Sequence, residues 1–351
     1  MTLKVAIVSG PRSPFPMGLE LAERRLLAAL RSARSDVQVE VRVVGRRQAR
    51  RHARTLGAHW VPVFTDKRLP RAAVRGADLV HLIGLDLPPP RDMPYVATVH
   101  DVSPLHFDDE GNFPPWFEEV LERAALIVTP SAFTRRELEV YFRVPTTRIR
   151  VIGGAPALDA REAVALSADE LARLGVTPPL VLRYGGYTKR KNVPLLLEAW
   201  EGVGVGTLVL AGPPQPARDV ILANASPLDR VVVLDYVPAS LLARLLKTAS
   251  VLVTTSSYEG YGLPAVEALS AGVPVVGVAS PSLTETCGEA VRTVHGTAAA
   301  LAGAIGAVLD DAARAQELRE AGLRRSARAN WSDCAARLLN AYVTTATATR
   351  S

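Results

Sequence analysis

Short apolar runs alternate with amphipathic stretches along most of the chain. Runs rich in branched apolar residues, such as 3–10 (LKVAIVSG), are typical of strands that are buried on both faces of a sheet. Stretches with apolar residues every three or four positions, such as 19–33 (LELAERRLLAALRSA), predict amphipathic helices. Strands that alternate with helices are typical of a parallel sheet covered by helices, so the pattern predicts the α/β class.

The alternation occurs twice, with an interruption near the middle of the chain. The predicted strands are 3–10, 37–45, 77–84, 95–101, 125–131 and 148–156, then 180–186, 207–214, 230–237, 250–258 and 273–280. A chain of 351 residues is long for a single core. We therefore predict two Rossmann-like βα domains facing each other across a cleft. The first is expected to span 1–155, a polar, proline-containing linker 156–178, and the second 179–330.

Candidate ligand contacts follow from the strand ends, because ligands of such sheets bind beyond the C-terminal ends of the strands. The residues of interest just after predicted strands are Gly10, His100, Ser131, Gly186, Gly212 and Glu259. We take Gly186 and Gly212, together with Tyr236 in the strand-like run 230–237, as candidate contacts to a nucleotide.

The stretch 256–277 (SSYEGYGLPAVEALSAGVPVVG) joins a strand to a helix through a glycine-punctuated loop. Pro264 suits a first helical position, and the unpaired amides of a helix N-terminus favour a phosphate. Glu259 is expected on the loop and Glu267 in the first helical turn. Because a carboxylate accepts two hydroxyl hydrogen bonds, the pair suits the ribose and the hexose of a sugar nucleotide. The alternative is an acid that merely suits the helix dipole and a solvated loop glutamate.

A second candidate region is 184–200 (YGGYTKRKNVPLLLEAW), where three cations stand between a strand and an amphipathic helix. Of these, Arg190 and Lys191 suit the neutralisation of a diphosphate as it leaves, since fixed charge matters most where charge develops. The alternative is an exposed basic turn.

The net charge of +6 comes from the first part of the chain. Residues 1–155 hold 23 Lys and Arg against 17 Asp and Glu, whereas the rest balance at 18 and 18. The excess is densest at 41–57 (VRVVGRRQARRHARTLG), which suits either peripheral contact with an anionic membrane or a solvated helix or loop. Cys287 and Cys334 lack a disulfide or zinc spacing, so we expect a cytoplasmic protein, with the inner membrane face as the place of any such contact.

Several stretches together resemble glycosyltransferase family 4, whose members have the GT-B fold. They are RKN before LLEAW, then 235–276 (DYVPASLLARLLKTASVLVTTSSYEGYGLPAVEALSAGVPVV) and 329–342 (ANWSDCAARLLNAY). In the first half, 96–107 (VATVHDVSPLHF) and 129–152 (TPSAFTRRELEVYFRVPTTRIRVI) look most like the mannosyltransferase-B-like branch. The resemblance covers nearly the whole chain.

The resemblance implies transfer of a sugar from a nucleotide diphosphate sugar, with retention of configuration and without a metal ion. It implies that Glu267 binds ribose hydroxyls, that Glu259 contacts the donor sugar, and that Arg190 and Lys191 stabilise the leaving diphosphate. The backbone amides that would hold the sugar or phosphates belong to Gly260, Tyr261, Gly262 and Leu263. His100 would reach the donor sugar, and a C-terminal helix within 331–351 would return to the first domain.

Two features of the sequence bear on these expectations. No Asp-x-Asp triplet and no histidine pair with helical ligand spacing occurs, so no metal is expected. Gly186 occupies the position at which many family members carry an additional arginine, which leaves phosphate binding to Arg190 and Lys191.

The leading interpretation is a retaining hexosyltransferase, with GDP-mannose favoured as donor by the branch resemblance. The acceptor is expected to be a glycan, a lipid-linked sugar or a small metabolite, and not a nucleic acid. One alternative is a dinucleotide-dependent dehydrogenase, but neither 9–18 (SGPRSPFPMG) nor 202–206 (GVGVG) supplies Gly-x-Gly-x-x-Gly. The other is a non-catalytic partner subunit, which loss of the glutamates or of the two cations would have supported.

Overall fold

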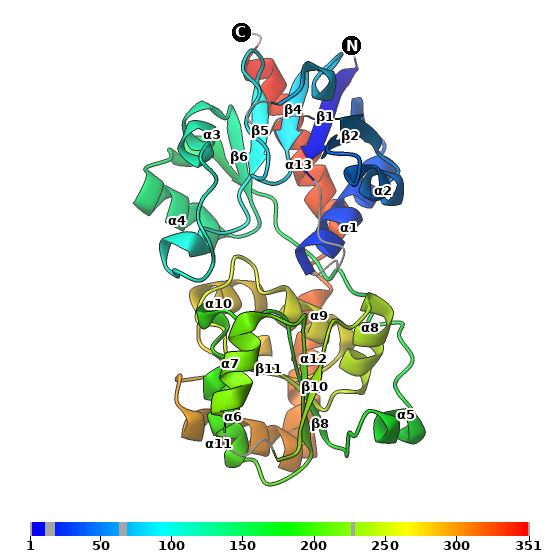
Figure 1. Ribbon diagram of the computed structural model, residues 1–351, viewed down its shortest axis with the longest axis vertical. Coiled ribbons are helices and arrows are strands. Elements are labelled where there is room, and N and C mark those ends of the chain that lie inside the picture. The colour runs from blue at the N-terminus through cyan, green and yellow to red at the C-terminus, as the bar shows by residue number, and fades with distance from the viewer. Residues whose placement is uncertain (1, 11–17, 63–68, 226–228, 350–351) are drawn as a thin grey trace. The chain divides into compact units, whose positions relative to one another are not determined.

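The computed structural model describes residues 2–10, 18–62, 69–225 and 229–349 of the chain (Figure 1). The chain divides into two compact units. Unit 1 comprises Met1–Gly154 and Asn330–Ser351, and unit 2 comprises Ala155–Ala329.

Unit 1 is built on a seven-stranded parallel sheet with the order β3-β2-β1-β4-β5-β6-β7. Its strands are β1 Leu3–Ser9, β2 Val37–Gly45, β3 His59–Pro62, β4 Leu79–Leu82, β5 Tyr95–Thr98, β6 Leu126–Thr129 and β7 Ile149–Val151. Its helices are α1 Gly18–Ser32, α2 Ala49–Thr55, α3 Phe117–Arg123, α4 Ala132–Phe142 and α13 Trp331–Ala348. Short 3₁₀ turns are η1 Arg71–Ala73, η2 Ser103–Leu105 and η3 Thr146–Arg148. The strand order reverses between β1 and β4, as in doubly wound folds.

Side chains of the central strand β1 alternate between two hydrophobic cores. Val5 and Ile7 belong to the core that also contains α1, α2 and α13, whereas Ala6 and Val8 belong to the core that contains α3. Both faces of the strand are therefore buried, which explains why it reads as a continuous apolar run.

A chain of two buried hydrogen bonds connects helix α13 to the sheet of unit 1. The Tyr342 hydroxyl lies 2.6 Å from Nδ1 of His81, whose Nε2 lies 2.7 Å from Oγ1 of Thr98. Burial lowers the pKa of His81 to about 3, so its ring is neutral and offers one donor and one acceptor to the two hydroxyls. The C-terminal segment thus completes the core of unit 1.

Unit 2 is built on a six-stranded parallel sheet with the order β10-β9-β8-β11-β12-β13. Its strands are β8 Leu180–Tyr184, β9 Thr207–Ala211, β10 Val231–Leu234, β11 Val251–Thr254, β12 Val275–Val278 and β13 Arg292–Val294. Its helices are α5 Ala168–Arg173, α6 Val193–Glu201, α7 Pro216–Asn224, α8 Ala239–Thr248, α9 Leu263–Ala271, α10 Pro281–Cys287, α11 Ala298–Asp310 and α12 Ala312–Ser326, with 3₁₀ turns η4 Lys189–Lys191 and η5 Gly288–Ala290. The prediction of two Rossmann-like parallel sheets is confirmed.

The structure adds to the sequence prediction at the sheet edges and near the middle of the chain. Strands β3 and β13 were not predicted, because edge strands of four and three residues are too short to show a period. Residues 156–178, expected to be a linker, lie within unit 2. There Leu158 and Leu171 are buried, and a capping box formed by Ser167 and Glu170 begins α5.

The arginine-rich segment 41–57 lies on β2 and on α2. The helix turns Ala49 and Ala53 towards the core, whereas Arg50, Arg51 and Arg54 are exposed. Arg46 and Arg47, just before the helix, are exposed as well. Within the described parts of the chain, no helix is long and apolar enough to cross a membrane.

Candidate active site

Glycine and proline shape the junction between β11 and α9. Gly262 has a φ of 84°, in the left-handed region that favours glycine, and it is the residue immediately before the helix. The helix begins at Leu263, so Pro264 is its second residue and not its first as expected. Glu267 is therefore the fifth helical residue and not in the first turn. This correction weakens the alternative in which Glu267 only complements the helix dipole, because that effect is confined to the first turn.

Glu267 is a buried carboxyl group with an exposed fraction of 1%. The backbone N–H groups of Ala157 and Leu158 each donate to its Oε1 at 3.3 Å, and the Tyr184 hydroxyl donates to its Oε2 at 2.5 Å. Burial raises the pKa of Glu267 to about 7, although these three donors act in the opposite direction. Near neutral pH this carboxyl group is close to its titration midpoint.

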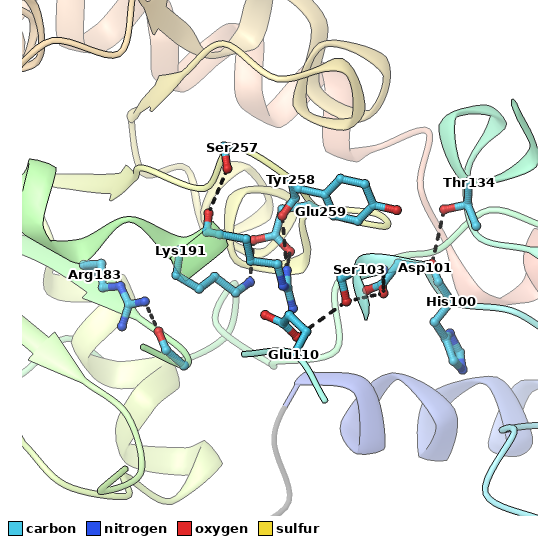
Figure 2. Close-up of polar contacts among 12 residues, drawn as sticks. His100, Asp101, Ser103, Glu110, Thr134, Arg183, Lys191, Ser257, Tyr258 and Glu259 are labelled. Carbon is cyan, nitrogen blue, oxygen red and sulfur yellow. Dashed lines mark hydrogen bonds and ion pairs between the residues drawn. The ribbon is translucent and has the colours of Figure 1, made fainter. Parts of the chain in front are cut away.

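Glu259 lies on the loop between β11 and α9 and is surrounded by cations, as Figure 2 shows for Lys191. Nζ of Lys191 lies 2.5 Å from Oε1, and Nη1 of Arg190 lies 3.0 Å from Oε2. Burial would raise the pKa of Glu259, but the charges of Lys191 and Arg190 outweigh it and hold the pKa at about 2. Glu259 is thus an ionised carboxylate, and the alternative of a solvated loop residue is wrong.

Arg190 and Lys191 belong to η4 and do not form an exposed turn. Their side chains are 14% and 15% exposed, and burial lowers the pKa of Lys191. Their backbone is held to the loop that carries Glu259, because Ser257 N–H donates to the Arg190 carbonyl at 2.9 Å and the Thr255 hydroxyl donates to the Lys191 carbonyl at 2.7 Å. The two cations and the glutamate therefore form one ion cluster that backbone hydrogen bonds hold together.

Arg183, at the end of β8, is a member of this region that the sequence analysis missed. It is 4% exposed, donates from Nη1 to the Gly185 carbonyl at 2.8 Å and from Nη2 to the Gly186 carbonyl, and stacks on the Tyr187 ring. Burial lowers its pKa to about 10, so it is still a cation near neutral pH, and Glu259 is among the charges that act on it. An arginine inside the apolar run LVLRY was the available signal, since buried charges are rare unless they have a partner or a function.

Gly186 and Gly212 lie near one another at the ends of β8 and β9. A Cβ atom on Gly212 would be 2.3 Å from the Gly185 carbonyl oxygen, so only glycine allows this approach. Gln215 links the same two loops, because its Oε1 accepts a hydrogen bond from Tyr187 N–H at 2.9 Å. Tyr236 follows β10, the next strand of the sheet.

His100 belongs to unit 1, whereas the other candidate residues belong to unit 2. It follows β5, is 31% exposed in its side chain, and places Nε2 3.2 Å from the Ile83 carbonyl oxygen and 3.8 Å from Oε1 of Glu23. Its own carbonyl accepts a hydrogen bond from the Thr134 hydroxyl at 3.2 Å (Figure 2). The part of the chain that the structure describes contains no group of three or more His, Cys, Asp or Glu residues that could hold a metal ion.

Comparison with known proteins identifies the class to which this fold and site belong. The family of glycosyl transferases group 1 matches residues 170–325, and glycosyltransferase family 4 matches residues 18–155. The chain is 31% identical over 276 residues to O-antigen chain mannosyltransferase B of Escherichia coli, covering 70% of this chain and 69% of that protein. It is 28% identical over 287 residues to alpha-maltose-1-phosphate synthase of Mycobacterium tuberculosis, covering 72% and 73%.

The fold is similar to that of solved glycosyltransferases. The structure of Anabaena HepE in complex with UDP and glucose superposes with a TM-score of 0.77 at 16% identity, covering 97% of this chain and all of that one. WaaG, a glycosyltransferase involved in lipopolysaccharide biosynthesis, superposes with a TM-score of 0.71 at 15% identity, covering 96% and 99%.

The protein is a glycosyltransferase of GT-B fold. Specifically, the chain belongs to glycosyltransferase family 4, and it transfers a sugar from a nucleotide-sugar donor to an acceptor. The dehydrogenase alternative is therefore wrong. The residues whose loss would have supported a non-catalytic partner, Glu259, Glu267, Arg190 and Lys191, are all present.

The raised pKa of Glu267 predicts how its replacement changes stability with pH. A carboxyl group whose pKa is raised in the folded state does not lower the free energy of unfolding below its unfolded-state pKa near 4.5. Above that pH it lowers the free energy of unfolding increasingly, until pH passes about 7. Relative to the wild type, Glu267→Gln should therefore gain up to about 3 kcal/mol in free energy of unfolding between pH 4.5 and pH 8. Urea titrations at both pH values measure this difference.

Glu198→Gln is the matched control for this measurement, because Glu198 is an exposed glutamate on α6 of the same unit. It should change stability by the same small amount at both pH values. Parallel pH profiles for wild type and Glu267→Gln would contradict the assignment of a destabilised, buried carboxyl group.

Proposed function

We propose that this protein is a retaining, metal-independent hexosyltransferase that uses a nucleotide diphosphate sugar. The hexose would pass to a hydroxyl group of a glycan, a lipid-linked sugar or a small metabolite. The observation that carries the proposal is a group of largely buried cations near Glu259 in unit 2. Arg190 and Lys191 pair with Glu259, and the buried Arg183 is a further cation on which the charge of Glu259 acts.

A leaving diphosphate is an anion that suits these cations. Charge accumulates on the diphosphate as the glycosidic bond breaks, and cations already held in place by the fold stabilise that charge without reorganisation. Glu259 keeps Lys191 and Arg190 in position and, as an ionised carboxylate, can still accept hydrogen bonds from hexose hydroxyls. The amides from Gly260 to Leu263, at the start of α9, would hold the phosphates or the sugar.

The nucleotide would be bound by residues at the neighbouring strand ends. We assign the ribose hydroxyls to Glu267, and further contacts to Gly186, Gly212 and Tyr236. Gly212 supports this assignment because its backbone packs closely against the Gly185 carbonyl oxygen, which keeps the ends of β8 and β9 together. For His100 we propose the contact to the donor sugar that the family resemblance implies.

The donor proposed is GDP-mannose. Its support is the similarity to O-antigen chain mannosyltransferase B, which is named for mannosyl transfer. HepE has been solved with UDP and with UDP-glucose at much lower identity, so UDP-sugars are the competing donor class.

Thermal unfolding against a panel of nucleoside diphosphates and their sugar conjugates tests the proposal. A ligand at 100 times its Kd adds ~2.7 kcal/mol to the folded state, which raises the midpoint by a few degrees for domains of this size. We expect GDP and GDP-mannose to raise the midpoint equally with and without EDTA. A shift with UDP compounds instead would change the proposed donor from GDP-mannose to a UDP-sugar. A shift that EDTA abolishes would contradict metal independence.

The role of Lys191 in leaving-group stabilisation predicts a loss of turnover. Lys191→Met keeps the length of the side chain, and Arg190 still pairs with Glu259, so the fold should persist. We expect kcat to fall by about 100-fold or more, with a smaller change in the affinity for free nucleotide, because the charge acts mainly in the transition state.

Lys189→Met is the matched control for this variant. Lys189 lies in the same turn η4 but is exposed, and its replacement should leave kcat nearly unchanged. Equal kcat values for the two variants, measured in a transfer assay on folded protein, would remove Lys191 from the catalytic machinery.

The exposed arginines around α2 support a proposal of peripheral contact with anionic lipid at the inner membrane face. Each cation near such a surface contributes roughly 1 kcal/mol. Flotation with phosphatidylglycerol-containing vesicles should recover the protein at low salt and lose it at high salt. A variant with Arg50, Arg51 and Arg54 changed to Gln should not float, and unchanged flotation would contradict the assignment.

A further inference from the structure

Tyr184 is the last residue of β8, and in the part of the chain that the structure describes it is the only side chain that donates a hydrogen bond to Glu267. Its hydroxyl lies 2.5 Å from Oε2 of Glu267 and 3.3 Å from the Pro264 carbonyl oxygen. It therefore joins the end of a central strand both to the first turn of α9 and to the carboxyl group on the next turn.

The three donors leave a defined part of the carboxylate open. An ionised carboxylate has about four acceptor sites, two on each oxygen. Oε1 receives the amides of Ala157 and Leu158 at 3.3 Å, longer than the usual ~2.9–3.0 Å, so both bonds are weak. Oε2 has one short bond, from Tyr184, and one site left. A diol could thus bind the open site of Oε2 and compete with the weak amide bonds at Oε1.

We propose that Tyr184 is a positioning residue, which fixes the Glu267 carboxylate in the orientation that meets the ribose diol and so makes nucleotide binding depend on the ribose hydroxyls. This inference rests on the proposed role of Glu267 in ribose binding. It goes further by naming the group that holds the carboxylate and by attributing to it the discrimination between ribose and deoxyribose.

The charged groups around Glu267 make its ionisation depend strongly on the hydrogen bond from Tyr184. Among the described residues no cation forms an ion pair with Glu267: Arg244 of α8 pairs with Glu170, and Arg325 of α12 donates to the backbone carbonyls of residues 285 and 286. Tyr184 acts on the pKa of Glu267, and its own pKa is raised well above the usual value by burial and by Glu267. It therefore stays a neutral donor throughout the neutral range.

Removing this donor changes the charge state of Glu267 as well as its orientation. Burial already raises the pKa of Glu267 to about 7, and the Tyr184 hydrogen bond opposes that rise. Without the hydroxyl the pKa rises further, so more of the carboxyl group is protonated at neutral pH. A protonated carboxyl group is a poorer acceptor for ribose hydroxyls, and alkaline pH should restore the ionised form.

Calorimetric titration of Tyr184→Phe with GDP, UDP and their 2′-deoxy analogues at pH 7 and pH 9 tests the proposal. For the nucleotide that the wild type binds, we expect about tenfold weaker binding at pH 7 and partial recovery at pH 9. We also expect the preference of the wild type for the ribonucleotide over its 2′-deoxy analogue to shrink. Tyr141→Phe, which removes a hydroxyl from a 52%-exposed tyrosine, is the control and should match the wild type throughout.

The outcomes separate this inference from the proposed function. If Glu267→Gln binds nucleotide as the wild type does, the ribose assignment itself is wrong. If Glu267→Gln binds weakly while Tyr184→Phe keeps the wild-type affinity, pH profile and ribose preference, only the positioning role is overturned. Equal weakening of Tyr184→Phe at both pH values and for both sugars would show a general packing defect, and would also overturn it.

Discussion

The ion cluster of Glu259 with Lys191 and Arg190 is the constraint on which the rest of the site depends. Burying a charge costs several kcal/mol unless a partner compensates for it, so the fold must hold the loop after β11 and the turn η4 together. The hydrogen bonds from Ser257 and Thr255 to the backbone of that turn do this. Arg183 is a further buried cation on which the charge of Glu259 acts.

Parallel sheet topology explains why these residues meet. β8 and β11 are neighbours in the sheet of unit 2, so the loops that follow them emerge at the same edge. Arg183 and Tyr184 come from the end of β8, and Glu259 and Glu267 from the segment after β11. Gly212, at the end of β9, keeps the adjacent loop close because it has no side chain. Charge, hydroxyl and amide groups are thereby gathered at one edge of the sheet.

The two glutamates show how environment divides the roles of identical side chains. Glu267 is buried and Glu259 is largely shielded from solvent, which by itself favours the neutral form of both. Cations at 2.5 and 3.0 Å hold the pKa of Glu259 at about 2, whereas a phenol and two long amide contacts leave the pKa of Glu267 at about 7. One is a permanent anion inside a cationic cluster, and the other is an acceptor whose charge depends on pH and on Tyr184.

The sequence by itself determined the α/β class, all the longer strands and the family, because hydrophobic period, glycine–proline punctuation and motif spacing are local properties of the chain. It also indicated Glu259, Glu267, Arg190 and Lys191, which lie in recognisable motifs. Only the tertiary structure decided that Arg183 joins the cluster, that Lys191 is buried, and that Tyr184 and the amides of residues 157 and 158 hold Glu267. Those contacts join residues 68 to 110 positions apart, so burial and ionisation arise only when the sheet brings the strand ends together.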